Sequence, residues 1–115
     1  MKLRIFCLCL AFFSFSSMSA EIKGKVQRVW THSSAYSTYD TTSPGLFMVA
    51  ISGMPKACGH VHGFGRFVID ESHPLYETVV SIVLSAKATN SDVWVNYLDT
   101  CNIRFNSWDF GSISF

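Results

Sequence analysis

The order of apolar and polar residues along the chain predicts a domain made mainly of strands. Over 21–31, apolar and polar side chains alternate, and the alternation changes phase between Val26 and Val29, which indicates a bulge in a curved strand. Over 46–51 every residue is apolar, as in a strand that is covered on both faces. Further strands are expected at 66–70, 93–98 and 111–115.

One helix is expected between the third and the fourth of these strands. Apolar residues recur there at intervals of three and four positions, as they do along the buried side of a helix. They are Leu75, Val79, Ile82, Val83 and Ala86. Ser72 or His73 is expected to cap the start of the helix, ahead of Pro74 in its first turn. Asn90 is expected to end it, because asparagine tolerates the left-handed conformation.

This order of three strands, a helix and two strands is that of the OB-fold, a five-stranded Greek-key barrel. We therefore predict a mainly β domain with one helix, built as an OB-fold-like barrel. An α+β antiparallel sheet with the helix on one face has the same order and stays open as an alternative. No repeat or linker divides 21–115, which are expected to form a single domain. Trp94 and Trp108 are expected in the core.

Residues 1–20 have the order of a secretory signal peptide, with a basic start, an apolar stretch over 5–15 and a small, polar end. Such a segment is removed on export, so we expect a protein that is secreted or periplasmic. The apolar stretch is shorter than the roughly 20 residues that a membrane-spanning helix needs. No later segment approaches that length, and no membrane span is expected.

Two cysteines, Cys58 and Cys101, remain once the signal peptide is removed. Disulfides persist in the compartments that exported proteins reach. We therefore expect a disulfide between these two residues. It would support a domain whose hydrophobic core is small.

The charged residues argue against a nucleic-acid-binding protein. Without Lys2 and Arg4, the nine basic residues become seven, against eight acidic ones. The remaining Lys and Arg residues are spread along the chain, whereas binding to a phosphate backbone requires them to cluster. No nucleic-acid partner is expected.

The segment 33–45 is the strongest candidate for a binding loop. It contains Ser34, Tyr36 and Tyr39 and closely follows Trp30, so that flat apolar rings and hydroxyl groups occur together. Such side chains suit a sugar ring or a groove on a protein, and OB-folds commonly bind through the loop that joins their first two strands. The alternative is a polar hairpin without a binding role, with Trp30 in the core.

Cys58, His60 and His62 lie close enough in sequence to bind one metal ion, because alternate residues of an extended segment project to the same side. If Cys58 forms the disulfide, only the two histidines remain as ligands. No Gly-x-Ser-x-Gly motif or comparable catalytic pattern is present. We therefore expect neither an enzyme nor a cofactor.

The chain also resembles known proteins at the opening strand Gly24-Lys25-Val26, at Leu84-Ser85-Ala86 in the helix, and at Val93-Trp94-Val95-Asn96-Tyr97 before the second cysteine. It is similar there to a diffuse family of small exported proteins of Gram-negative bacteria. In size, signal peptide, single disulfide and final strand it also resembles the receptor-binding B subunits of AB5 toxins. The resemblance implies an OB-like barrel, a glycan ligand and a homo-oligomeric ring.

The expected function is that of an exported, non-enzymatic domain that binds a glycan or a protein. A periplasmic metal-binding protein that uses His60 and His62 is one alternative. The other is an accessory or inhibitor subunit of a secreted complex, which would have the same sequence features.

Overall fold

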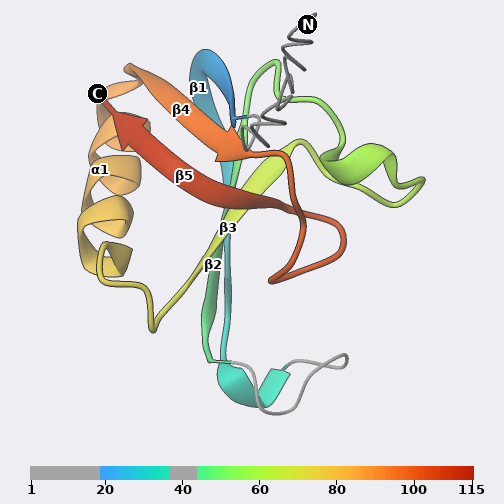
Figure 1. The fold of residues 1–115 in the computed structure, drawn as a ribbon. Coiled ribbons are helices and arrows are strands. Elements are labelled where there is room, and N and C mark those ends of the chain that lie inside the picture. The colour runs from blue at the N-terminus through green and yellow to red at the C-terminus, as the bar shows by residue number, and fades with distance from the viewer. Residues whose placement is uncertain (1–18, 37–43) are drawn as a thin grey trace, which may run out of the picture.

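The computed structural model describes residues 19–36 and 44–115, which form five strands and one α-helix (Figure 1). The strands are β1 (Ser19–His32), β2 (Leu46–Ile51), β3 (Arg66–Asp70), β4 (Asp92–Leu98) and β5 (Trp108–Ser114), and the helix is α1 (Tyr76–Thr89). Two short 3-10 helices, η1 (Ser34–Tyr36) and η2 (Ala57–Gly59), lie in loops. Most of the expected signal peptide lies outside the described residues. Ser19 and Ala20 belong to β1 and pair with β4.

The five strands close into a barrel in the order β1-β2-β3-β5-β4. The long strand β1 pairs with β4 through its first half and with β2 through its second half. A short parallel pairing of β3 with β5 closes the ring, at Phe67 opposite Trp108 and Val68 opposite Asp109. The prediction of an OB-fold-like barrel is confirmed, and the alternative of an open antiparallel sheet is wrong.

The phase change in β1 is a bulge, as predicted, because the register with β2 shifts between Val26 and Arg28. Beyond the bulge, successive residues of β1 point alternately into and out of the barrel. Val29, Val49 and Phe67 form a row inside it, whereas Arg28, Ala50 and Arg66 form the neighbouring row outside. The interior is filled by buried side chains of every strand and of α1, including Phe47, Val49, Ile51, Phe67, Ile69, Val79, Val83, Val93 and Val95.

The helix α1 begins later than predicted. Leu75 is its N-cap and makes no side-chain capping bond, so the expected cap at Ser72 or His73 is wrong. The preceding residues form turns instead, in which the Leu75 N–H donates to His73 Nδ1 at 3.0 Å. Leu75 itself is 48% exposed and does not belong to the buried stripe. Val79, Val83 and Ala86 of the stripe are buried against the barrel, whereas Ile82 is only partly buried, and Asn90 ends the helix with φ 51°, as predicted.

The last two strands differ from the expectation in detail. β5 starts at Trp108, three residues before the predicted strand, and the buried Trp108 indole N–H donates to the Pro55 carbonyl oxygen at 3.0 Å. Trp94 points outward from β4 and is 39% exposed, so its predicted place in the core is wrong. The cause is the alternation of β4, which turns Val93, Val95 and Tyr97 inward.

The predicted disulfide between Cys58 and Cys101 is present, with a Cα–Cα distance of 6.4 Å. It joins η2, in the loop before β3, to the start of the loop between β4 and β5. Both loops project on the side of the barrel away from α1 (Figure 1). In the part of the chain that the structure describes, no helix is long and apolar enough to cross a membrane.

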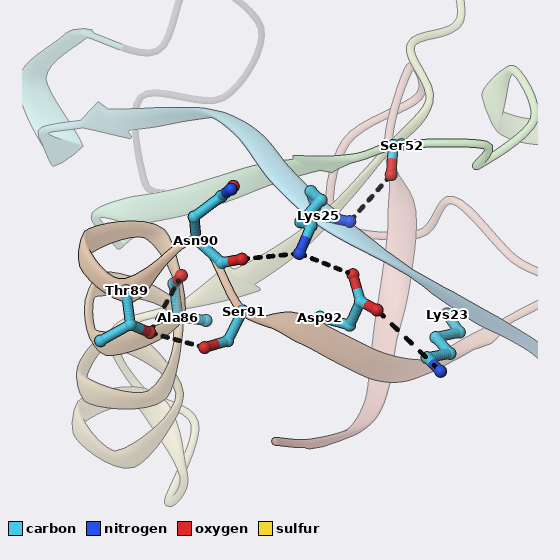
Figure 2. Close-up of polar contacts among 8 residues, drawn as sticks. All are labelled: Lys23, Lys25, Ser52, Ala86, Thr89, Asn90, Ser91 and Asp92. Atoms are coloured by element: carbon cyan, nitrogen blue, oxygen red, sulfur yellow. Dashed lines mark hydrogen bonds and ion pairs between the residues drawn. The ribbon is translucent and has the colours of Figure 1, made fainter.

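A set of polar contacts, the seam, ties the end of α1 to β1 and β4 (Figure 2). It consists of Lys23, Lys25, Asn90 and Asp92. Lys25 Nζ donates to the Asn90 carbonyl oxygen at 2.6 Å and lies 3.2 Å from the Asp92 carboxylate. Lys23 Nζ lies 3.9 Å from the other oxygen of that carboxylate. One acidic residue therefore balances two lysines.

Candidate functional site

The outer face of β1, β2 and β3 carries the side chains that point away from the barrel interior. Strand register places them in three adjacent rows. The rows are Arg28–Ala50–Arg66, Trp30–Met48–Val68 and His32–Leu46–Asp70. In OB-folds the face of strands 2 and 3, with the loops that flank it, is the usual ligand-binding surface. These rows are therefore the main candidates for a ligand-binding site.

The centre of this face is not open to solvent. Leu46, Met48 and Val68 are buried in a second apolar cluster, separate from the barrel interior, and Trp30 packs against them. The loop between β4 and β5 lies against β3, where Ile103 and Val68 line the same cleft of about 320 Å³. The loop thus leaves the part of the face around Trp30 as the accessible region.

Arg66 is the most unusual residue of the face, because its charged side chain is only 4% exposed. Its Nε donates to Ser107 Oγ at 2.7 Å, and one Nη donates to Asn106 Oδ1 at 3.1 Å. Both acceptors are neutral. The loop that contains them is itself held to the segment before β3, since the Phe64 N–H donates to the Asn106 carbonyl oxygen at 3.1 Å. The guanidinium is thereby fixed in one orientation.

Aromatic rings complete the surroundings of Arg66. Its guanidinium carbon lies 4.6 Å from the centroid of Trp30 and 4.2 Å from that of Phe64. Arg28 adds a second cation, 4.7 Å from the Trp30 centroid. We call these four residues, Arg28, Trp30, Phe64 and Arg66, the arginine–tryptophan stack. Cation–π contacts of this kind contribute from about 0.5 to 2 kcal/mol, more where water is excluded.

The stack carries positive charge, and neither Arg28 nor Arg66 forms an ion pair with a residue of 19–36 or 44–115. Lys23 and Lys25 are paired with Asp92 at the seam. Burial, and then the neighbouring Arg104 and Arg28, lower the pKa of Arg66 to about 10, so it remains charged at neutral pH. Burial, and then Arg104 and Arg66, lower the pKa of His32. Both pKa shifts reflect burial first and the neighbouring positive charges second.

The predicted binding loop lies beside this face. Tyr36 is 65% exposed, and its ring meets that of His32 edge to face at a centroid distance of 4.9 Å. Ser34 is exposed in the same short helix η1, at the tip of the β1–β2 hairpin (Figure 1). Tyr39 lies outside the described residues. Tyr36 therefore extends the aromatic surface of the stack through His32.

The predicted metal-binding cluster has lost one of its members. Cys58 is bonded to Cys101 and cannot be a ligand. The rings of His60 and His62 are 5.7 Å apart, and the His62 N–H donates to His60 Nδ1 at 3.0 Å. No group of three His, Cys, Asp or Glu side chains in the described ranges is placed to bind one ion. A site made of the two histidines alone stays a prediction.

Sequence reasoning did not identify most of the stack. It named Trp30 beside the predicted binding loop, with a place in the core as the alternative, and did not single out Arg28, Phe64 or Arg66. One signal was present, because Arg28 and Trp30 are separated by one residue in a strand and therefore share a face. Nothing in the sequence could show that Arg66, from another strand, would meet the same ring. The chain has no significant match among protein-family models, curated proteins or solved structures.

Proposed function

We propose that the chain is an exported, non-enzymatic binding domain that recognises a glycan on the outer face of β1–β3. The observation that carries this proposal is the partly exposed Trp30, which two guanidinium groups hold in place on the usual ligand surface of an OB-fold. Both flanking loops of that surface are also in position, since η1 lies at one end and the β4–β5 loop lies against β3.

The chemistry of the face suits a sugar better than a purely apolar ligand. Sugar rings have an apolar side that can pack on an indole and a rim of hydroxyl groups that need hydrogen-bond partners. Trp30, His32 and Tyr36 provide ring surfaces, while Arg28 provides donors at the exposed edge. Because the stack fixes Trp30 before the ligand arrives, little side-chain entropy is lost on binding.

A protein-binding role is the second candidate, and one observation favours it. Val61, Phe64 and Phe105 are 77%, 46% and 38% exposed, and together they line a shallow depression next to the stack. Exposed apolar side chains that gather in one place often mark a surface where another protein binds. Such a partner would use this depression, whereas a glycan would use Trp30.

The proposal is tested by screening the purified protein on an array of glycans and measuring the affinity of the best ligand by calorimetry. Trp30→Ala should weaken that affinity about tenfold or more, since a lost stacking contact of about 1.4 kcal/mol has this effect. Trp94→Ala is the matched control, because Trp94 is also exposed under a cation but lies on β4. It should leave the affinity unchanged. Equal losses in both variants, or no glycan bound at all, would contradict the proposal.

A further inference from the structure

Arg66 sits where an apolar side chain would be expected. Its guanidinium packs against two aromatic rings that themselves meet edge to face, beside the buried cluster of Leu46, Met48 and Val68. Burying a cation is costly unless an anion or several hydrogen bonds offset the loss of water. Ser107 and Asn106 supply hydrogen bonds but no negative charge. The position is thus prepared for an anion that none of the described neighbouring side chains provides.

The guanidinium of Arg66 also has N–H groups that form no hydrogen bond with a described residue. A guanidinium has five N–H groups, and the bonds to Ser107 and Asn106 use two of them. Arg28 shares the Trp30 ring with Arg66, and no carboxylate of the described residues lies within 4.0 Å of either guanidinium. Two guanidinium groups beside one ring form a natural receptor for an oxyanion, which accepts charge-assisted bonds from both.

The distribution of charge indicates how many acidic groups the ligand carries. A phosphate polymer needs cations along an extended track. Here Lys23 and Lys25 are balanced by Asp92 at the seam, and the two cations that lie over Trp30, Arg28 and Arg66, form one compact pair and not a track. This arrangement fits one acidic group attached to a ring that packs on the indole.

We propose that the arginine–tryptophan stack is the binding site for an acidic oligosaccharide. A carboxylate or sulfate of the ligand binds to Arg28 and Arg66, and a sugar ring next to it packs on Trp30. This inference rests on the proposed glycan-binding function and specifies the ligand class of the same site.

The test compares three galactose-based oligosaccharides of equal length by calorimetry at low salt. One is neutral, one contains galacturonic acid and one is sulfated; a short oligothymidine serves as a fourth ligand. We expect the neutral form to bind at least tenfold more weakly than the better of the two acidic forms. The order of the carboxylated and sulfated forms identifies which oxyanion the site accepts.

Arg28→Gln should lower the affinity for the acidic form about tenfold and leave the neutral form unaffected. Arg28 is exposed, so this variant is expected to fold. Lys23→Gln is the matched control, because Lys23 also lies over a tryptophan but has an acidic neighbour. It should bind both forms as the unchanged protein does. Arg66→Lys, which keeps the charge but not the planar fork, should weaken acidic binding if it folds.

The outcomes separate the inference from the proposed function. Equal binding of neutral and acidic forms, with both weakened by Trp30→Ala, would overturn the inference and leave the glycan-binding function standing. Binding of none of the oligosaccharides would overturn both. Oligothymidine that binds more tightly than every oligosaccharide would also overturn both, and would assign the face to single-stranded nucleic acid.

Discussion

Two places on the barrel hold a cation over a tryptophan ring, and they differ in how the charge is balanced. At the seam, Lys23 Nζ lies 4.8 Å from the Trp94 centroid and 3.9 Å from the Asp92 carboxylate. On the outer face, Arg28 and Arg66 share Trp30 without an acidic neighbour among the described residues. The seam is also open to water, since the Lys23 side chain is 54% exposed, whereas Arg66 is 4% exposed.

The difference shows that a cation–aromatic contact is not by itself a sign of function. The seam is satisfied internally, and exposed ion pairs of this kind contribute at most about 1 kcal/mol. It holds the end of α1 against β1 and β4 and needs no ligand. The stack on the outer face retains charge where water screens it poorly, so an added anion interacts more favourably with the stack than with the seam. The same pair of chemical groups therefore has a structural role at the seam, and we propose a binding role for it on the outer face.

The largest expected effect is the loss of thermal stability when the disulfide is removed. The disulfide lies near the outer face and not at the seam. The disulfide between Cys58 and Cys101 connects the β2–β3 loop to the β4–β5 loop, which lies against the outer face, and neither cysteine belongs to the seam. In the chain-entropy model, a closed loop of this length stabilises the fold by roughly 4 kcal/mol. The double variant C58S/C101S should therefore melt about 20 °C lower in a thermal scan followed by circular dichroism.

The control for this prediction is the unchanged protein in a reducing agent. It should melt where the double variant does, and the reducing agent should have no further effect on the variant. Binding of the acidic saccharide should weaken as well, because the loop that orients Arg66 loses its anchor. An unchanged melting temperature after complete reduction would show that the disulfide does not support the fold.

The next effect tests the charge imbalance directly. Ala50 lies between Arg28 and Arg66 in the outer row, so its side chain is a direct cross-strand neighbour of both. Ala50→Glu should supply the missing carboxylate. We expect at least a tenfold loss of affinity for the acidic oligosaccharide by calorimetry. We also expect a change of less than about 1 kcal/mol in the free energy of unfolding by denaturant titration.

Ala50→Gln is the matched control, because it has nearly the same size and no charge. If it weakens binding as much as Ala50→Glu, the effect is steric and the role given to the charges is wrong. The reverse change at the seam is Asp92→Asn, which creates there the imbalance that the outer face has naturally. It should cost less than about 1 kcal/mol of stability and leave binding unchanged.

Most of the fold could be predicted because it depends on local patterns. The phase change in β1, the apolar run of β2 and the position of α1 are each visible within about a dozen residues. The errors occur where tertiary contacts decide. The helix starts at Tyr76 because turns involving Asp70 and His73 use the backbone N–H groups of the residues before it. β5 begins at Trp108 because that residue pairs with β3, about forty positions earlier in the chain.

The candidate site was much less predictable. Arg28 and Trp30 share a face in any strand, but Phe64 and Arg66 reach the same ring only because β2 lies between β1 and β3. The burial of Arg66 depends on Asn106 and Ser107, which lie in a loop without sequence features of its own. The aromatic loop residue Tyr36 was predicted correctly as exposed, and its contact with His32 follows from the geometry of the hairpin tip.

The smallest expected effect concerns His32, which belongs to the outer face and has no counterpart at the seam. Burial, followed by the positive charges of Arg104 and Arg66, lowers its pKa in the folded protein. Between this lowered pKa and the ordinary value near 6.5, the unfolded chain binds more protons than the folded one. Stability should therefore fall as the pH drops through this range and should recover as the pH rises. His32→Gln should remove this contribution from denaturant curves measured between pH 7.5 and 5.

Protonation of His32, which lowers the stability of the protein, should strengthen its binding to an anionic ligand. An oxyanion in the stack offsets the charges of Arg28 and Arg66, so the protonated form of His32 becomes easier to hold and adds a further cation to the face. Affinity for the sulfated oligosaccharide, whose own charge does not change in this range, should rise by about threefold between pH 7.5 and 5, the equivalent of one weak ion pair. His32→Gln should abolish the rise, and His73→Gln, at the start of α1, should preserve it. If the protein becomes less stable and binds more tightly as the pH falls, the outer face, unlike the seam, carries unbalanced positive charge that an anionic ligand offsets.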